Sequence, residues 1–286
     1  MIKKTGLPAV DLALWHYGST LLEVRDLSDR GDPASLRGWI SDVYFPALLS
    51  GAADQLVRRL GARASVDDPL YGRASGDAVR GYLRDVATQL MEVQATFTKV
   101  AFTLGADRDV TEGTLEVACR ESRVAIPVGV VAVRRPGREL IVRVYFDARH
   151  IGGRRAVRTP LVPGDAKVSV PPAVAAHLQA LDRGDLDGVI ATFEPGAAVR
   201  DPRGCLHARE ESTRAMWRYY KAIFDATSRG VTWHPGGQAD DGRTCAIEVT
   251  VDGSASVNAD GHPGLAVYEI GDSGLLRALR LYEEHA

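Results

Sequence analysis

The feature that most constrains the fold is a spacing that occurs twice in the chain. Tyr44 precedes Asp68 by 24 positions, and His177 precedes Asp201 by the same 24. A proline follows each aspartate, and a glycine-containing turn, a helical segment and several strand-like runs come after it. Because the repeat period of about 133 residues has the size of a domain, the spacing indicates a tandem duplication and not a solenoid of short repeats.

Length and composition fit a globular protein of two domains. The chain has 286 residues, 45% of them hydrophobic and 25% charged, with a formal net charge of −2. This charge gives no reason to expect a nucleic-acid or membrane partner, and no apolar run approaches the ~20 residues of a membrane span. Three cysteines without metal-type spacing, Cys119, Cys205 and Cys245, are typical of reduced thiols. We therefore expect a cytoplasmic protein.

The chain is expected to consist of four segments. Turn residues before position 33 separate a helical N-terminal extension, 1–32, from a first domain, 33–150. Prolines, glycines and basic residues over 151–170 are typical of a linker, and a second domain follows over 171–286.

Within each half, helical patterns come first and strands follow, which is an α+β order and not βαβ. Helices are predicted over 35–60 and 76–92 in the first half and over 172–193 and 207–226 in the second. The expected fold is a curved antiparallel sheet that wraps around the N-terminal helices as a cone with one closed pocket. The outer face of each sheet needs a partner. The other half is the simplest one and gives an intramolecular pseudo-dimer, while a homodimer stays open.

The segments around the two Asp-Pro pairs resemble a known superfamily. Residues 64–76, with Asp68, and residues 193–202, with Asp201, are similar to the nuclear transport factor 2-like superfamily in its ketosteroid isomerase and SnoaL-like polyketide cyclase branch. The resemblance covers both repeats, about 250 residues, but not the first 30. It implies a cystatin-like α+β barrel in each half, and it is less specific for the reaction than for the fold.

The resemblance also implies roles for particular residues. In ketosteroid isomerases the aspartate of this turn is the general base, and a tyrosine 24 residues earlier donates a hydrogen bond to the substrate oxyanion. By position, Asp68 would be the base and Tyr44 the donor. The place of the family's second acid falls on Gly129, and this departure argues against steroid isomerisation itself. The same scaffold, also as tandem fusions, serves polyether epoxide hydrolases that use an aspartate and a second carboxylate.

Each of these candidates also has a purely structural interpretation. Asp68 and Asp201 are either exposed turn carboxylates or bases that point into an apolar cone, where desolvation raises the pKa of a carboxyl group. Tyr44 lies on an apolar helical stripe and is either a core tyrosine or an oxyanion donor. His177 occupies the same place in the second repeat and is either a buried structural residue or a donor and proton relay.

Glu116 and Glu248 lie at similar places in middle strands and alternate with apolar neighbours. If the face that carries them lines the cone, each is a partner carboxylate of a two-acid site. If it is the outer face, each is an interface or surface residue. The remaining histidines, His207, His234 and His262, are scattered in predicted loops and do not suggest a metal site.

These observations favour a cofactor-independent acid–base enzyme without a metal, of the isomerase, cyclase or epoxide hydrolase type. Its substrate would be an apolar small molecule such as a polyketide, a terpenoid or a steroid-like compound. The alternative is a non-catalytic small-molecule-binding or dimerisation module of the same fold. Since Tyr44 and His177 differ, we also expect the two pockets to differ in size and polarity.

Overall fold

The structure is a computed structural model that describes residues 39–119, 122–135, 139–147, 158, 168–210, 214–227, 231–252 and 261–283. The expected N-terminal extension, 1–32, and most of the expected linker lie outside the described residues. Among the helices that are described, none is both long enough and apolar enough to cross a membrane.

The first half has helices and strands in the order α2 Ile40–Leu49, α3 Ala53–Leu60, β1 Ser65–Asp68, β2 Gly72–Ser75, α4 Ala78–Glu92, β3 Thr96–Leu104, β4 Arg108–Cys119, β5 Ser122–Arg135 and β6 Glu139–Tyr145. The second half has α5 Pro172–Asp182, α6 Leu186–Ala191, β7 Phe193–Arg200, β8 Leu206–Ala208, α7 Ala215–Ala226, β9 Thr232–Asp240, β10 Thr244–Asp252, β11 His262–Ile270 and β12 Leu276–Glu283.

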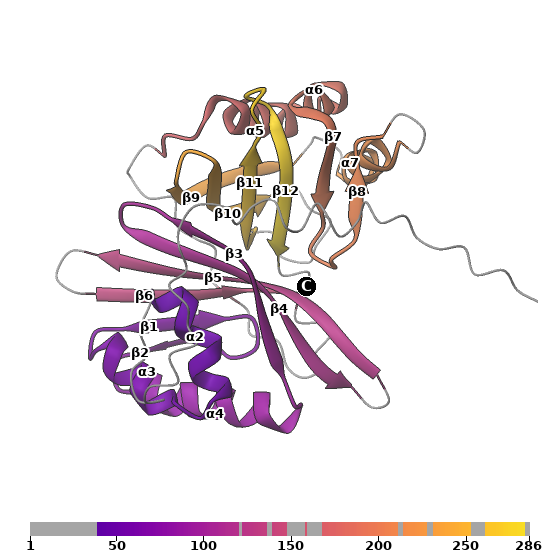
Figure 1. The fold of residues 1–286 in the computed structure, drawn as a ribbon. Coiled ribbons are helices and arrows are strands. Elements are labelled where there is room, and N and C mark those ends of the chain that lie inside the picture. Colours follow the sequence, from indigo (N-terminus) through magenta and orange to yellow (C-terminus); the bar gives the residue numbers. More distant parts are fainter. Residues whose placement is uncertain are drawn as a thin grey trace, which may run out of the picture. The chain divides into compact units, whose positions relative to one another are not determined.

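The two halves share one topology, which confirms the predicted α+β fold and the tandem duplication. The first sheet has the strand order β2-β1-β6-β5-β4-β3, and the second has β8-β7-β12-β11-β10-β9. In each sheet the strand that ends at the Asp-Pro turn pairs parallel with the last strand, while the other pairs are antiparallel. Figure 1 shows the helices of each half beside their own sheet.

The predicted helices differ from the structure in two ways: 35–60 and 172–193 each contain two helices, and the helix expected over 207–226 begins later. The segment 35–60 is interrupted between Leu49 and Ala53, where Gly51 has φ +75°. The helix expected over 207–226 is wrong in its first turns, because β8 occupies 206–208 and α7 begins only at Ala215. The turn after Asp201, with Gly204 at φ +85°, folds the chain back so that β8 pairs with β7.

Each sheet has one face against its own helices. In the first half this core includes Leu48, Leu83, Leu115 and Val130, and in the second it includes Val174, Ile247 and Leu279. Because side chains alternate between the two faces of a strand, the intervening residues face the other way. They form a third buried cluster that joins the two sheets: Val110, Val131, Val133, Ile141, Tyr145, Ala239, Ala246, Leu265, Val267 and Tyr282.

Two buried glutamates, one from each half, accept hydrogen bonds from the other half across this interface. Glu112 of β4 accepts hydrogen bonds from Arg280 Nε at 2.6 Å and from the Tyr282 hydroxyl at 2.7 Å. Glu248 of β10 accepts from Arg143 Nη2 and from the Tyr145 hydroxyl, both at 2.6 Å. We call these two sets the reciprocal clamps.

In addition, Arg108 Nη1 lies 2.8 Å from Glu248 Oε2. Burial raises the pKa of Glu248, but the hydrogen-bonded arginines outweigh it and hold this pKa at about 2.

The strand register shows that Glu112, and not Glu116, is the structural equivalent of Glu248. Glu112 pairs with Gly129 and Gly129 with Tyr145, while Glu248 pairs with Leu265 and Leu265 with Tyr282. The sequence suggested that Glu116 corresponds to Glu248. This correspondence is wrong by four residues, the distance between Glu112 and Glu116 on β4. Sequence alternation alone gives a face but not a position along the strand.

We predict that Glu112→Ala lowers the free energy of unfolding by about 3–5 kcal/mol, because Arg280 and Tyr282 then lose a buried carboxylate partner. The matched control is Glu116→Ala, on the same strand but exposed, which should change stability by less than about 0.5 kcal/mol. Urea denaturation followed by circular dichroism measures both values. Equal losses in the two variants would contradict a role of the clamp in stability.

Candidate active site

The two Asp-Pro turns are built in the same way. Asp68 Oδ1 accepts backbone N–H groups of Leu70 at 2.8 Å and Tyr71 at 2.9 Å. Asp201 Oδ1 accepts those of Arg203 at 3.0 Å and Cys205 at 2.8 Å. Such turns form because an aspartate side chain can take the place of a backbone carbonyl. One carboxylate oxygen is thereby fixed, and Oδ2 is left to contact other groups.

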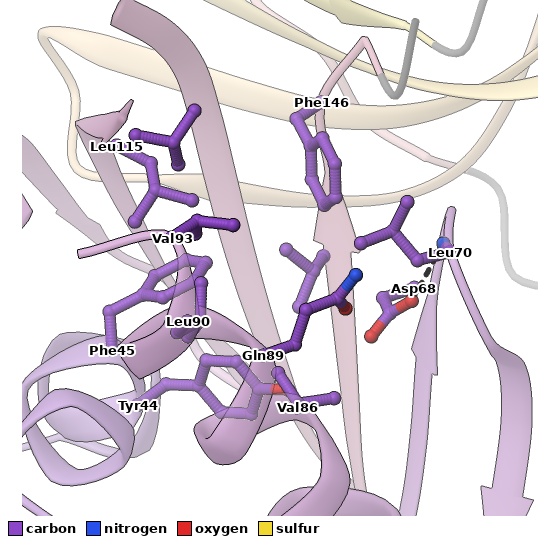
Figure 2. Close-up of a pocket in the computed structure, with 12 residues that line it drawn as sticks. Tyr44, Phe45, Asp68, Leu70, Val86, Gln89, Leu90, Val93, Leu115 and Phe146 are labelled. Atoms are coloured by element: carbon purple, nitrogen blue, oxygen red, sulfur yellow. Dashed lines mark hydrogen bonds between the residues drawn. The ribbon is translucent and has the colours of Figure 1, made fainter. Parts of the chain in front are cut away.

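In the first half, Asp68 and Tyr44 border the same cavity. Figure 2 shows them on α2 and β1 with Leu70 and Phe146 nearby. The cavity has a volume of about 30 Å³, which is room for about two water molecules. Tyr44 and Asp68 therefore border one space, but that space is too small for a substrate.

Hydrogen bonds and charge in this cavity centre on Asp68. The Tyr82 hydroxyl donates to Asp68 Oδ2, and the side chain of Asp68 is almost completely buried. Burial raises the pKa of Asp68, although the hydrogen bonds from Tyr82 and from the backbone act against it. Burial and the charge of Asp68 raise the pKa of Tyr44 well above its usual value. The Tyr44 hydroxyl is buried and has no hydrogen-bond partner among the described residues.

The second half contains a much larger cavity, of about 400 Å³. This volume lies in the range of small-molecule sites. One part of its wall is apolar or aromatic and comprises Leu181, Pro202, Ala222, Ile223, Ala226, Val231, Trp233, Val251 and Leu281. The polar part comprises Asp201, Arg203, Tyr219, Tyr220, Thr227 and Glu283. An apolar wall with a few polar groups is the usual composition of a ligand site.

Asp201 lines this second cavity and is paired with a histidine. His207 Nε2 lies 3.1 Å from Asp201 Oδ2, and the side chains of His207 and Asp201 are 23% and 13% exposed. The ring of His207 stacks on that of Tyr219 with the centroids 4.3 Å apart. The carboxylate is thus held on both oxygens while it still borders the cavity, which is the position that a general base needs.

Glu283 provides a second carboxylate in the same cavity, and His262 Nε2 lies 3.6 Å from it. Burial raises the pKa of Tyr219 well above its usual value, and the charges of Glu283 and Asp201 raise it further. Burial and the charge of Glu283 do the same for Tyr220. Both tyrosines therefore stay protonated at neutral pH and can act as hydrogen-bond donors.

Two replacements distinguish the linings of the two cavities. Following the repeat, Phe146 of the first half corresponds to Glu283, and Leu70 corresponds to Arg203. Phe146 and Leu70 are apolar and line the small cavity, whereas Glu283 and Arg203 are charged and line the large one.

His177 lies in the core behind the second cavity and does not belong to its described lining. Its Nε2 is 3.0 Å from the Tyr220 hydroxyl, and its Nδ1 is 3.2 Å from the Tyr268 hydroxyl. Phe193 and Trp233 contact the ring edge to face. Burial lowers the pKa of His177 to about 3, so the imidazole is neutral in the folded protein.

The remaining candidates lie away from both cavities. Glu116 is exposed near Arg123, and Glu248 belongs to a reciprocal clamp, so the outer-face alternative applies to both. Gly129, taken from the sequence as the place of a second acid, also faces the interface. A Cβ atom there would lie 2.4 Å from Leu265 Cδ2. Position 129 is therefore not a cavity position, and that assignment is wrong.

Sequence reasoning missed His207 and Glu283. His207 was taken as a loop residue, yet Gly204 turns the chain so that His207 returns to Asp201 six positions later. A histidine shortly after an Asp-Pro-x-Gly turn is the signal that could have indicated it. Glu283 lies two and four positions after Leu281 and Leu279, which face the core, so the two-residue period of a strand would have placed it inside the cone. No group of three or more metal-type side chains occurs in the ranges described above.

We predict that His177 makes folding stability depend on pH. The unfolded imidazole has a pKa near 6.5, whereas the folded pKa is about 3. Protons therefore bind more readily to the unfolded chain, so the contribution of His177 is complete above pH 6.5 and is lost as the pH falls toward 3. Between pH 6 and pH 4 the free energy of unfolding should fall more steeply, by about 1 kcal/mol per pH unit, than in His177→Gln.

The measurement is urea denaturation at several pH values. The control is Met91→Ala, an exposed position without a titratable group, and this variant should keep the slope of the parent chain. A parent slope equal to that of His177→Gln would show that the imidazole is not buried in its neutral form.

Comparisons with known proteins agree with this architecture. Residues 174–278 match the family model described as the SnoaL-like domain. A 72-residue stretch is 39% identical to L-fucono-1,5-lactonase of Burkholderia multivorans. The match covers 25% of this chain and 24% of the lactonase, so the chain spans about a quarter of the length of that relative.

Two solved structures are similar to part of the chain. One is a proposed polyketide cyclase of Sinorhizobium meliloti, at 24% identity and a TM-score of 0.34, covering 39% of this chain and 94% of the other. The second is SalBIII, an epoxide hydrolase/cyclase-like enzyme in pyran ring formation of the polyether salinomycin, at 17% identity and a TM-score of 0.32, covering 39% and 87%. The family match covers residues 174–278, less than half of the chain, and it is this stretch that is similar to a SnoaL-like domain.

Proposed function

We propose that the chain is a cofactor-independent acid–base enzyme that acts on a mostly apolar small molecule in the second cavity. The observation that carries the proposal is the position of Asp201. Its carboxylate borders a cavity of about 400 Å³ with an extensive apolar wall, and two backbone N–H groups and His207 fix its orientation. A base held in place beside a mostly apolar space can act without first reorganising water around it.

In this proposal Asp201 removes a proton from the substrate or from a water molecule, and His207 stabilises the carboxylate. A tyrosine hydroxyl of the cavity wall donates to the oxygen that gains negative charge. Isomerisation, cyclisation and epoxide opening all need both a base and a hydrogen-bond donor to the substrate oxygen. Lactone opening, the activity in the name of the Burkholderia relative, needs them too, with water as the nucleophile.

We propose a supporting role for the first half. Its cavity of about 30 Å³ has no room for such a substrate, while its sheet provides half of each reciprocal clamp. The two halves, 33–150 and 171–286, would then work as an intramolecular pseudo-dimer with one active cone. A cytoplasmic location suits the exposed free thiol of Cys205.

The test is turnover of a panel of probes: an aryl epoxide, an apolar β,γ-unsaturated cyclic ketone and a 1,5-lactone. For any probe that is turned over, Asp201→Asn should lower kcat by roughly 10²–10⁴, because it keeps shape and hydrogen bonds but removes the base. The matched control is Asp68→Asn at the equivalent turn of the first repeat, which should keep near-normal turnover.

The opposite pattern, loss in Asp68→Asn and normal turnover in Asp201→Asn, would assign the chemistry to the first cavity with Tyr44. Binding of the probes without turnover of any of them would favour the non-catalytic binding module.

A further inference from the structure

Three side chains form a continuous hydrogen-bonded series that ends at the second cavity. The Tyr268 hydroxyl contacts His177 Nδ1, and His177 Nε2 contacts the Tyr220 hydroxyl. Tyr268 and His177 have no exposed surface and are not among the cavity lining, whereas Tyr220 lines the cavity. The series therefore has a closed end at Tyr268 and an open end at Tyr220.

The number of protons in this series decides the direction of each hydrogen bond. A neutral imidazole has one N–H donor and one acceptor nitrogen, and each tyrosine hydroxyl has one proton to donate. Two arrangements are possible. In the first, Tyr268 donates to Nδ1 and Nε2–H donates to Tyr220. In the reversed one, Nδ1–H donates to Tyr268 and Tyr220 donates to Nε2.

In the reversed arrangement the proton of Tyr268 would have no acceptor. Within the described part of the chain, the Tyr268 hydroxyl has no hydrogen bond other than that to His177. A buried donor left unpaired is costly, since it loses its bonds to water and gains nothing. The first arrangement leaves no such donor, because the proton of Tyr220 points away from His177 and toward the cavity.

The charge distribution supports this direction. Glu283 lines the same cavity and is close enough to raise the pKa of Tyr220 by its charge. A negative charge in the cavity attracts the O–H proton and keeps it on the cavity side. Burial also keeps the imidazole of His177 neutral, as the proton count requires.

The described residues of the first half do not form such a series. Tyr44 takes the place of His177, and the register that aligns Val131 with Val267 puts Ala132 in the place of Tyr268. The Tyr44 hydroxyl accordingly has no partner among the residues described, and Tyr82 donates to Asp68 instead.

We infer that Tyr220 is the hydrogen-bond donor to the substrate oxygen in the second cavity, and that His177 and Tyr268 are positioning residues that direct its O–H there. This inference rests on the proposed function for the identity of the acceptor, a carbonyl or epoxide oxygen. The donor thus comes from helix α7, and not from the helical position of Tyr44 and His177 that the sequence indicated.

The first test is the tautomer of His177, observed by long-range ¹H–¹⁵N NMR of the full chain at pH 7, with the signals assigned by their loss in His177→Gln. We expect a neutral ring with the proton on Nε2. Tyr268→Phe, which removes the donor to Nδ1, should shift the proton toward Nδ1, while Tyr219→Phe should leave the signals unchanged. A parent ring protonated on Nδ1 or on both nitrogens would overturn the inference, and this result does not require Tyr268→Phe to fold.

The second test uses acetophenone labelled with ¹³C at its carbonyl as the probe. We expect its carbonyl infrared band to move to lower frequency when it binds the parent chain, and this shift to vanish in Tyr220→Phe with a loss of affinity of roughly 2- to 10-fold. The neighbouring tyrosine provides the control, since Tyr219→Phe should keep the shift.

An unshifted band, a shift that depends on Tyr219, or no binding at millimolar acetophenone would overturn the donor role of Tyr220. A shifted band without turnover of any panel substrate would leave the donor assigned and remove the enzyme proposal, so the two failures are distinguishable.

Discussion

The arrangement of the two sheets depends on two carboxylates that are removed from water. Placing a glutamate in an interface costs several kcal/mol unless strong donors replace its hydration. Here an arginine and a tyrosine two positions apart on the last strand of each half point to the same face and hold the glutamate of the other half. The contact is self-complementary, as in a twofold dimer, although a single chain forms it.

The outer faces of the two sheets form the interface, so the inner faces, which pack on the helices, can carry different side chains in the two halves. Each sheet curves around its own helices, and the end of its last strand lies beside the Asp-Pro turn. Phe146 and Leu70 occupy this region in the first half, and Glu283 and Arg203 occupy it in the second. The same backbone therefore surrounds a cavity of about 30 Å³ in one half and of about 400 Å³ in the other. Side-chain volume and charge, and not topology, decide which half can hold a ligand.

The sequence predicted the parts of the fold that depend on local pattern. The spacing from Tyr44 to Asp68 and from His177 to Asp201, together with the helix-then-strand order, indicated two copies of one α+β unit. The short strand β8 was missed because its pairing with β7 depends on the turn around Gly204 and not on its own three residues. Glu116 was matched to Glu248 because alternation along a strand gives the face of a residue but not its partner across the sheet. His207 and Glu283 join the candidate site only through the folded turn and the parallel pairing of β7 with β12.

The histidine that replaces Tyr44 in the second repeat shows how the two halves differ in their cores. A buried polar side chain is tolerated when its hydrogen bonds are made, and His177 has a tyrosine at each ring nitrogen. In the first half the polar groups gather around Asp68, which receives hydrogen bonds from Tyr82 and two backbone N–H groups, and the adjacent space is nearly closed. In the second half Asp201 and Tyr220 both line the larger cavity. His207 and backbone N–H groups hydrogen-bond Asp201, and His177 hydrogen-bonds Tyr220. A base and a donor that are fixed by the protein and still reach a ligand are what acid–base chemistry needs, so the larger cone is the half in which the fold can perform it.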